Sequence, residues 1–345
     1  AMTSHPLCPE GLEKRIESAL TLIWKRVDCF QTLLIKDSSF CTRQTIKDYL
    51  RISRDLLLKM LNELPTGEEK VEAKLDSGEV IKLKIELTNE SIQFDFAGTS
   101  SSQRICLTDS ATFGCCFGSF SAFLKKKIPM NSGTFSIFQV TTPLGSMLNA
   151  KYPSPTYKGM TDGTSQVAGL VLQGLSEIFP KQRVSASAQT SSQISLEFEN
   201  GKKFFDSLPG GVGASSSNDG ADAIHFWTRN KLRNSVQEIE TLFPLTIHQI
   251  GLKKGSGGKG KFKGGKGLTK EFELLSNALL QWNMQQRKTP PKGQQGAHDG
   301  EPPEIIIHRK SGETENIEKD EGSIALKKGD RIVVSSAGGG GFGKN

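Results

Sequence analysis

The sequence lacks the cysteine patterns of a disulfide scaffold or a zinc site. Its six cysteines all lie in the first third of the chain, between Cys8 and Cys116, and no two of them form a CxxC pair. Disulfide-stabilised small proteins and structural zinc sites both depend on such spacings. Cys115 and Cys116 lie in an apolar stretch, residues 111–124, so we expect them to be buried thiols. The pattern indicates a reducing, cytoplasmic compartment.

Long hydrophobic runs are also missing. No stretch approaches the ~20 apolar residues of a membrane-spanning helix, and residues 1–15 lack the basic-then-apolar order of a signal peptide. We therefore expect a soluble protein that is neither exported nor inserted in a membrane. The five histidines are scattered without an HExxH or HxH pair, and GxSxG is absent, so the chain carries no recognisable hydrolase motif.

The segment 253–270 is rich in lysine and contains no acidic residue. Residues 253–270 hold seven lysines, which equals the whole formal net charge of +7. Proteins that bind nucleic acid usually add aromatic side chains that stack on bases, and this run offers only Phe262. Nucleic acid is therefore not expected as a partner. Binding of another polyanion through this run is a further candidate function. Its mark would be an affinity for the polyanion that falls steeply as the salt concentration rises.

The glycines of the same run do not form a phosphate-binding loop. A Walker A motif needs GxxxxGK followed by Ser or Thr, because that hydroxyl binds magnesium. Here Gly255, Gly260 and Lys261 have the required spacing, but the next residue is Phe262, which has no hydroxyl. The sequence also predicts no strand that leads through this run into a long helix. The pattern favours a glycine-rich β-hairpin with positive φ angles, solvated by its lysines.

The first half of the chain is predicted to contain helices, then strands, then helices. Residues 11–65 show two helical patterns with apolar residues three and four apart. Residues 70–97 alternate between apolar and polar residues with turns at 76–78 and 88–90, which predicts a three-stranded meander. Buried helices are predicted at 111–127 and 165–179, joined by a long irregular stretch rich in Pro, Gly and Asn.

The second half is predicted to be rich in strands, without a βαβ alternation. Strands are expected at residues 184–190, 194–198, 203–208, 223–229, 243–252, 268–275, 304–310 and 330–336. Surface loops are expected at 287–303 and 312–322. The fold class is therefore α+β: a β-rich main domain with long Gly-rich loops, residues 66–345, preceded by a helical N-terminal segment, residues 1–65.

Several blocks along the chain resemble one known family. They are Phe94–Thr99 (FDFAGT), Ile128–Gly133 (IPMNSG), Pro143–Asn149 (PLGSMLN), Gly210–Ala214 (GGVGA), Gly255–Gly267 (GSGGKGKFKGGKG) and Gly338–Gly343 (GGGGFG). In this order they are similar to the C-terminal part of the hydantoinase B/5-oxoprolinase family, which includes the B subunits of N-methylhydantoinases and the alpha subunits of acetone carboxylases. The resemblance also gives the lysine-glycine run a structural role.

The resemblance implies ATP-dependent opening of a cyclic amide, such as a hydantoin or 5-oxoproline. An A-type partner subunit would bind ATP and activate the amide by phosphoryl transfer, and the B-type chain would complete the hydrolysis. Ring opening needs a polarised carbonyl, a positioned water and a base, commonly with help from a metal. The family thus implies a divalent metal, whose ligands are not identified in this sequence.

The sequence also departs from the family. Its members are usually longer and begin with a region that carries a DPxxGGTHxxD-like block with metal-ligand character, and residues 1–70 contain nothing similar. Three explanations stay open: a separate chain carries the N-terminal half, the sequence is a C-terminal fragment, or the protein is a non-catalytic assembly or ligand-binding relative. We rank first a subunit or C-terminal portion of a cyclic-amide hydrolase that is active only with the A-type partner and the missing metal-bearing half.

Polar residues in loops bounded by glycine and proline are candidates for a substrate-binding rim. They are Asp95, Thr99, Asn131, Asn149, His225 and Arg229. Each also has a structural interpretation, since asparagine side chains can satisfy turns and an arginine can bind a carboxylate. A second set is expected to be structural glycines in loops: Gly98, Gly210, Gly211, Gly213, Gly257, Gly258, Gly264, Gly265, Gly339 and Gly340.

Overall fold

The computed structural model describes residues 11–36, 43–124, 127–229 and 234–344. The chain forms two compact units: residues 1–59 with 128–136, and residues 60–127 with 137–345. The domain boundary expected at residue 65 stays a prediction. Among the described residues, no helix is long and apolar enough to cross a membrane.

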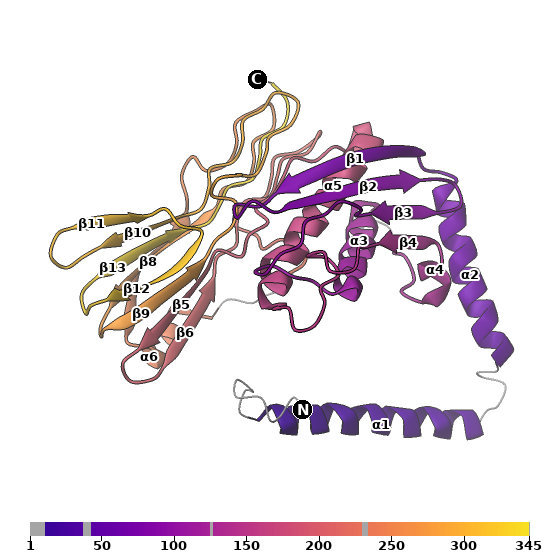
Figure 1. Ribbon diagram of the computed structural model, residues 1–345, viewed down its shortest axis with the longest axis horizontal. Coiled ribbons are helices and arrows are strands. Elements are labelled where there is room, and N and C mark those ends of the chain that lie inside the picture. The colour runs from indigo at the N-terminus through magenta and orange to yellow at the C-terminus, as the bar shows by residue number, and fades with distance from the viewer. Residues whose placement is uncertain (1–10, 37–42, 125–126, 230–233, 345) are drawn as a thin grey trace. The chain divides into compact units, whose positions relative to one another are not determined.

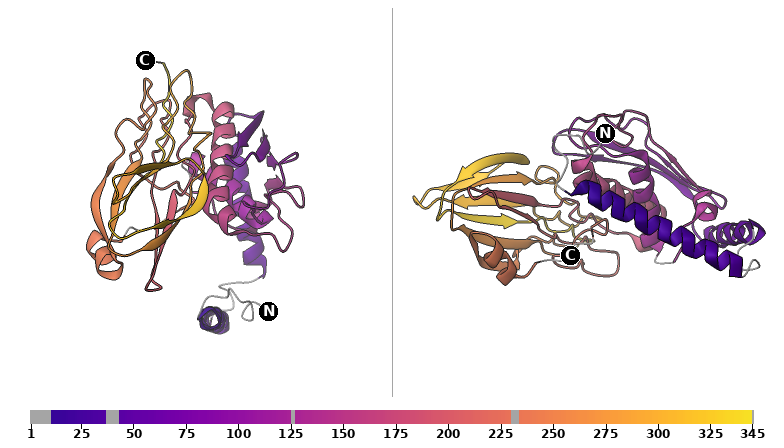
Figure 2. Two further views of the ribbon diagram at one scale, coloured as in Figure 1. Left: turned by 60° about the vertical axis from the view of Figure 1, so that its left-hand side comes forward. Right: turned by 90° about the horizontal axis from the view of Figure 1, so that it is seen from below.

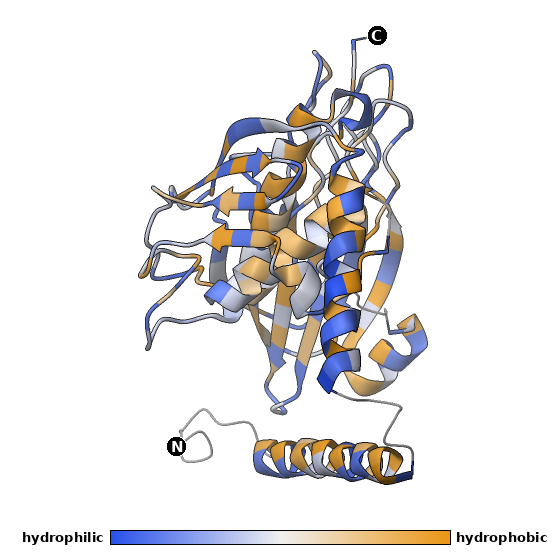
Figure 3. Cartoon of the chain, turned by 90° about the vertical axis from the view of Figure 1, so that its right-hand side faces the viewer, coloured by the Kyte–Doolittle hydropathy of each residue, from blue (hydrophilic) through white to orange (hydrophobic). Residues whose placement is uncertain are grey.

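The first unit is built from helices. Helix α1 spans Leu12–Lys36, α2 spans Arg43–Leu61 and α4 spans Ser132–Phe135. A Cβ at Gly133 would lie 2.0 Å from the Leu50 carbonyl oxygen, so only glycine allows α4 to approach the backbone of α2 this closely. Helix α1 differs from α2 because none of its residues is buried. Figure 3 shows apolar and polar residues interleaved along α1.

The second unit contains a four-stranded sheet covered by helices. Strands β1 (Gly67–Lys74), β2 (Val80–Leu87) and β3 (Ile92–Asp95) form the predicted antiparallel meander, and β4 (Phe138–Thr141) joins β3 in parallel. Helices α3 (Asp109–Leu124) and α5 (Thr164–Ile178) contact each other, and α5 packs on β1 and β2 (Figure 1). Both helices lie where the sequence predicted them.

Aromatic residues hold α3 against this sheet. The ring of Phe138 on β4 stacks with Phe94 of β3 at a centroid distance of 6.4 Å. It meets Phe117 and Phe120 of α3 edge to face, at 5.1 and 5.5 Å. Such aromatic pairs add stabilisation beyond the apolar area that they bury.

The same unit contains two further antiparallel sheets, whose strands are drawn in Figure 2. The five-stranded sheet has the order β11-β10-β13-β8-β7, with β7 at Leu245–Leu252, β8 at Leu268–Leu274, β10 at Glu304–His308, β11 at Thr314–Ile317 and β13 at Arg331–Ser335. The four-stranded sheet has the order β12-β9-β5-β6, with β5 at Gln193–Phe198, β6 at Lys203–Ser207, β9 at Ala278–Asn283 and β12 at Glu321–Leu326.

One apolar core lies between these two sheets. It includes Phe204 of β6 and Phe272 of β8, whose ring centroids are 5.8 Å apart. A buried ion pair joins the same two strands, since the ammonium of Lys270 donates to the carboxylate of Asp206. The short helix α6, Val236–Leu242, follows its N-cap Ser235 and contributes Ile239 to the core.

Beyond these strands, extended segments form a glycine-rich bundle. It consists of residues 184–188, 209–224, 256–267, 291–300 and 336–343, which exchange backbone hydrogen bonds outside any sheet. A Cβ at Gly264 would lie 1.9 Å from the Gly339 carbonyl oxygen, and one at Gly211 would lie 1.9 Å from the Gly265 carbonyl oxygen. The segments therefore lie too close to one another for any larger residue at these positions.

The α+β class and the helical N-terminal segment are confirmed. Several details of the strand and loop predictions were wrong. Residues 184–190 and 223–229 are not strands, and residues 253–267 do not form a β-hairpin. The backbones of residues 184–188, 223–224 and 256–267 pair with neighbouring segments of the glycine-rich bundle, and the Arg229 N–H closes a turn on the Phe226 carbonyl oxygen. The loop expected at 312–322 contains β11 and the start of β12, and neither β9 nor β12 was predicted as a strand.

Candidate functional site

A π-helix places a fully buried carboxylate at the start of α5. This element, η1, spans Gly159–Gly163 and carries Asp162, which has no exposed surface. A Cβ at Gly159 would lie 1.7 Å from the Cys106 carbonyl oxygen, so the glycine allows η1 to approach that backbone. Single π-helical turns within helices occur frequently at functional sites.

Hydrogen bonds from the loop before β5 and from the end of β9 converge on Asp162. Its Oδ1 accepts from the backbone N–H of Ser191 at 2.9 Å and from the Ser191 hydroxyl at 3.1 Å. Its Oδ2 accepts from Nδ2 of Asn283, the last residue of β9, at 2.6 Å. Burial raises the pKa of Asp162, while the bonds from Ser191 and the charge of Arg229 oppose that rise. We call Asp162, Thr190, Ser191, Asn283 and Arg229 the Asp162 site.

Arg229 fastens a loop to η1. Its Nε donates to the Thr161 carbonyl oxygen at 2.9 Å, and its Nη2 donates to the same oxygen. The hydroxyls of the adjacent Thr228 and of Ser165 on α5 lie 2.7 Å apart. Burial lowers the pKa of Arg229 and the charge of Asp162 opposes this, but an arginine stays protonated in proteins.

Buried acceptors beside the Asp162 site lack a donor in the described part of the chain. They are Oδ1 of Asn283, Oε1 of Gln285 and the hydroxyl oxygen of Ser192. Gln193 of β5 lies opposite Asn283 of β9. Ser192 directly precedes Gln193, and Gln285 follows Asn283 by two residues, so the three acceptors lie in one region. A buried polar atom without a partner costs roughly 1–3 kcal/mol. Such atoms commonly bind a buried water or a ligand that donates a hydrogen bond.

Backbone strain occurs at the same place. Ser192 has φ 39° and Gln286 has φ 65°, in the left-handed region that glycine favours. Oε1 of Gln286 accepts from the Gln189 backbone N–H at 2.5 Å, and the Thr190 hydroxyl accepts from the Gln285 N–H at 3.0 Å. Strained residues held by such bonds cluster at functional sites, which supports a role for this region.

Charged residues near the Asp162 site form a partly exposed group, the charged rim. Arg104 pairs with Asp320 at 3.2 Å and with Glu321 at 2.6 Å, and Lys158 binds the second oxygen of Glu321. Gln285 connects the rim to the site, because its Nε2 donates to Asp320 at 3.4 Å. The rim is electrically balanced, so it suits a polar ligand better than a strongly charged one.

The predicted candidates Asp95 and Thr99 lie where β3 ends. Oδ1 of Asp95 accepts from the Ala97 N–H at 2.9 Å, and its side chain lines a shallow pocket with Lys70, Lys82 and Lys84. The Thr99 hydroxyl donates to the Lys82 carbonyl oxygen and accepts from the Lys82 N–H, both at 3.1 Å. These contacts fix the turn to β2.

The two predicted asparagines stabilise turns. Asn131, in the first unit, caps α4 by accepting from the Gly133 N–H at 3.0 Å, and it donates to the Ser53 hydroxyl at 2.9 Å. Asn149 donates to the Thr142 carbonyl oxygen at 3.2 Å. His225 is half-buried in the loop that leads to Arg229. Of the six candidates, only Arg229 belongs to the Asp162 site.

Sequence reasoning did not select Asp162, Ser191 or Asn283. The available signal was the segment Gly159–Gly163, which carries an acid between two glycines. Nothing in the local sequence shows that Ser191 and Asn283 donate to this acid, because they are far from it along the chain.

The described residues do not fit the metal that the family implies. They contain no group of three or more His, Cys, Asp or Glu side chains that could hold a metal ion.

The lysine-glycine run does not offer a phosphate-binding loop. Such a loop presents free backbone N–H groups to phosphate oxygens. Here the Gly258 N–H donates to the Gly339 carbonyl oxygen and the Gly265 N–H to the Val212 carbonyl oxygen, both within the glycine-rich bundle. The Lys263 N–H donates to the Asp219 carboxylate. These donors are already used, so the structure gives the run a packing role.

The charge of this run is also partly compensated. Lys270 is buried against Asp206, and Lys253 pairs with Glu304 at 3.1 Å. The excess of positive charge available to a polyanion is therefore smaller than the sequence indicated.

Comparison with known proteins agrees with this architecture. A crystal structure of an ATP-dependent caprolactamase from Pseudomonas jessenii matches 91% of this chain and 58% of that chain, with a TM-score of 0.78 and 20% identity. At this identity the likeness shows a shared fold.

Sequence comparison defines the class. The family model described as hydantoinase B/oxoprolinase matches residues 30–345, so the chain belongs to this family. Among its relatives, 5-oxoprolinase from Dictyostelium discoideum is 26% identical over 78% of this chain and 21% of the relative. A putative B-type subunit of a D-/L-hydantoinase from a Pseudomonas strain is 23% identical over 74% of this chain and 46% of the relative. The chain thus spans less than half the length of these two relatives.

Proposed function

We propose that the chain supplies part of an ATP-dependent enzyme that opens a cyclic amide, either 5-oxoproline or a hydantoin. The observation that carries this proposal is the family match over residues 30–345. Relatives named as a 5-oxoprolinase and as a B-type hydantoinase subunit support the substrate class. The name of the second relative supports an A-type subunit as a partner.

ATP binds to the A-type partner in this proposal. Phosphoryl transfer from ATP to the amide oxygen releases ADP and makes the carbonyl carbon more electrophilic. A water then attacks this carbon as a base takes its proton, the ring C–N bond breaks with protonation of the nitrogen, and phosphate leaves as the carboxylate forms. In this proposal the metal-bearing half of the family lies outside the described residues, either in a separate chain or in a longer protein of which this sequence is a part.

This chain contributes polar contacts that orient the substrate. The Asn283 and Gln285 carbonyl oxygens lack donors and can accept the N–H of a ring amide. Asp162 holds Asn283 in place through Nδ2, so the free Oδ1 has a fixed direction. The assignment of ring binding to these two side chains rests on their unsatisfied acceptors.

Reconstitution tests the proposal. This chain, an A-type subunit and a chain carrying the family's N-terminal half are mixed, and ADP release is followed with 5-oxoproline and with hydantoin. We expect substrate-dependent ADP release and ring-opened product only when all three chains are present. A stable complex that leaves both rings intact would contradict the enzyme and favour the alternative, a non-catalytic assembly or ligand-binding relative.

The proposal includes a cytoplasmic, reducing compartment. Among the described residues, Cys29, Cys106, Cys115 and Cys116 are free thiols. Recovery of activity in the presence of a thiol reductant, and its loss under oxidising conditions, would support this placement.

A further inference from the structure

The Asp162 site is closed to solvent, although η1 lies near the surface of the second unit. Met160, two residues before Asp162, is 56% exposed and Thr161 is partly exposed, whereas Asp162 is 0% exposed. The unpaired oxygens of Asn283 and Gln285 are buried as well. A ligand can therefore reach these acceptors only if part of the chain moves.

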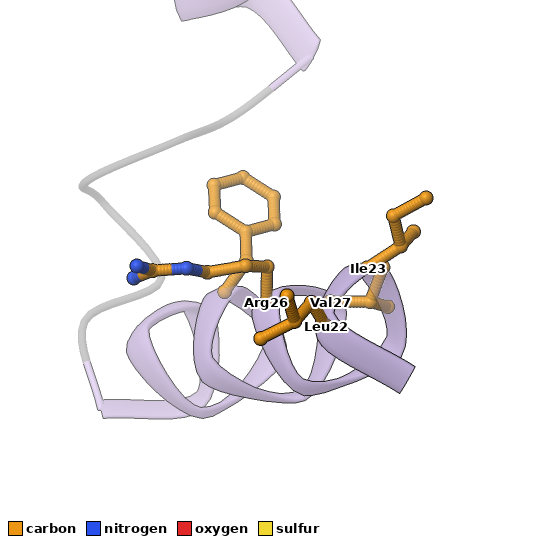
Figure 4. Close-up of a pocket in the computed structure, with 5 residues that line it drawn as sticks. Leu22, Ile23, Arg26 and Val27 are labelled. Atoms are coloured by element: carbon orange, nitrogen blue, oxygen red, sulfur yellow. The ribbon is translucent and has the colours of Figure 1, made fainter. Parts of the chain in front are cut away.

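Two surface hollows of the described chain do not lead to this site. One lies beside Asp95, and the other lies on α1, where Ile23 and Val27 line it (Figure 4). Neither hollow contains a residue of the Asp162 site, so neither offers an entrance to it.

A short segment, residues 226–229, is attached to η1 and to α5, and we call it the strap. The Thr228 hydroxyl lies 2.7 Å from the hydroxyl of Ser165 on α5. Nε of Arg229 donates to the Thr161 carbonyl oxygen on η1 at 2.9 Å. These two attachment points lie on either side of the buried carboxylate along the chain, so the strap crosses the place where that carboxylate is enclosed.

The third attachment of the strap is an aromatic ring that rests on a glycine. A Cβ at Gly118 of α3 would lie 2.3 Å from Cη2 of Trp227, so the ring occupies the space that the missing side chain leaves. Trp227 is still 41% exposed in this position. The ring is therefore seated at the surface of α3 and is not part of the core.

The backbone of the strap is weakly tied to the rest of the protein. In the described part of the chain, the backbone hydrogen bonds of the glycine-rich bundle reach Ile224, and the one that involves residues 226–229 joins the Arg229 N–H to the Phe226 carbonyl oxygen, within the strap. None of residues 226–229 is buried. Segments with few buried contacts and few backbone hydrogen bonds open locally at a lower cost than global unfolding.

We infer that the strap is a gate over the Asp162 site, which opens by local release of Trp227, Thr228 and Arg229 and admits a small ligand that carries N–H donors. The donors are required because the unpaired oxygens of the site only accept hydrogen bonds. This inference rests on the proposed function for the identity of the ligand, a ring amide, whereas the opening itself does not depend on it.

Chemical labelling of carboxylates tests the gate. The full-length protein is treated with a water-soluble carbodiimide and glycine ethyl ester, which modify a carboxylate only where these small reagents reach it, and peptide mass spectrometry gives the initial rates. The gate variant is Gly118→Ala, because the added Cβ displaces the Trp227 ring. The control is Gly114→Ala on the same helix, which gains the same helix propensity and has nothing within 4 Å of its Cβ. Asp330, whose side chain is 4% exposed, is the reference for a buried carboxylate elsewhere in the unit.

We expect Asp162 to be labelled at least about 10-fold faster in Gly118→Ala than in the wild type and within about 2-fold of the wild type in Gly114→Ala, because only the first substitution overpacks a contact that holds the strap closed. Asp330 should be labelled slowly and equally in all these proteins. A second variant, Thr228→Val, removes the hydroxyl contact with Ser165 without adding bulk. It should accelerate the labelling of Asp162 by about 3-fold or more.

Equal labelling of Asp162 in Gly118→Ala and Gly114→Ala, together with no effect of Thr228→Val, would overturn the gate. A parallel rise at Asp162 and Asp330 would overturn it too, because the whole unit would then be loosened. Faster labelling of Asp162 in a complex that leaves both rings intact supports the gate and rejects the proposed function. Ring opening with unchanged labelling rejects only the gate.

Discussion

Asn283 donates a hydrogen bond of 2.6 Å to Oδ2 of Asp162, across more than a hundred residues of sequence. The bond joins the end of β9 to η1, and Ser191 donates to the other oxygen from the loop before β5. A single buried carboxylate therefore connects η1, at the start of α5, to the last residue of β9 and to the loop before β5.

Replacing Asp162 should destabilise the protein. In Asp162→Ala the donors of Ser191 and Asn283 lose their acceptor inside the protein, at a cost of roughly 1–3 kcal/mol for each buried group. Asp162→Asn should cost less, because one acceptor oxygen remains. Urea unfolding measures both. The exposed Asp55→Asn is the control, with an expected change within about 0.5 kcal/mol, and an equal effect at both positions would contradict the buried role.

Asp330 should make the free energy of unfolding depend on pH in the acidic range. Burial by itself would raise the pKa of Asp330, but hydrogen bonds from the Lys327 and Lys310 N–H groups and from Arg309 lower it below the ordinary 3.8. Because the folded pKa lies below the unfolded one, this contribution is complete above pH 3.8 and is lost as the pH falls through the folded pKa. Asp330→Asn should therefore reduce the free energy of unfolding by about 2 kcal/mol at pH 7 and by less near pH 3.

Urea midpoints of the wild type and Asp330→Asn at the two pH values check this sign. A difference that grows as the pH falls would contradict it.

Glycines of the bundle should not tolerate even a methyl group. The Cβ of Gly264→Ala would meet the Gly339 carbonyl oxygen at 1.9 Å, and overpacking against backbone costs about 3 kcal/mol or more. Gly114→Ala is the matched control, since its Cβ on helix α3 has nothing within 4 Å. This control should gain about 0.5–1 kcal/mol from helix propensity. Thermal unfolding distinguishes them, and similar midpoints would refute close packing in the bundle.

Thiol labelling should separate buried from exposed cysteines. Burial raises the pKa of Cys115 to about 12, and that of Cys116 well above its ordinary range. Thiolates are the reactive form, so both should resist iodoacetamide at pH 8 in the folded protein. Cys29 is exposed on α1 and should react first. Peptide mass spectrometry after timed labelling reads each site, and fast labelling of Cys116 without denaturant would contradict its burial.

Local sequence patterns predicted most of the fold where an element carries its own signal. Helix α5 has an apolar face and ends before Pro180, and β2 alternates regularly from Val80 to Leu87, so both were recognised. Residues 184–190 also alternate, but their partners are bundle segments: the Ala188 N–H donates to the Gly211 carbonyl oxygen. The alternation therefore gave a wrong strand. β9 alternates as well, with Ala278, Leu280 and Trp282 buried, and was overlooked.

The candidate site was less accessible to sequence reasoning. Asp95 and Asn131 were chosen as polar residues in loops bounded by glycine and proline, and their described hydrogen bonds stabilise the turns in which they lie. Arg229 was chosen for the same rim, with carboxylate binding as its structural alternative; it binds the Thr161 carbonyl oxygen and acts on the neighbouring Asp162 through its charge. Asp162 itself depends on donors from distant strands, and such convergence is visible only after folding.

The glycine-rich bundle also constrains how the protein is made. Gly340 donates to the Ala186 carbonyl oxygen, and its own carbonyl oxygen accepts from the Ala214 N–H. Residues 184–224 leave the ribosome long before residues 336–343 are translated. Until then, the Ala186 carbonyl oxygen and the Ala214 N–H lack their hydrogen-bond partner Gly340. Domains generally fold as units during synthesis. Here, a ribosome that stalls shortly before residue 336 would release a chain whose sheets are largely complete but whose glycine segments remain open to chaperones and proteases.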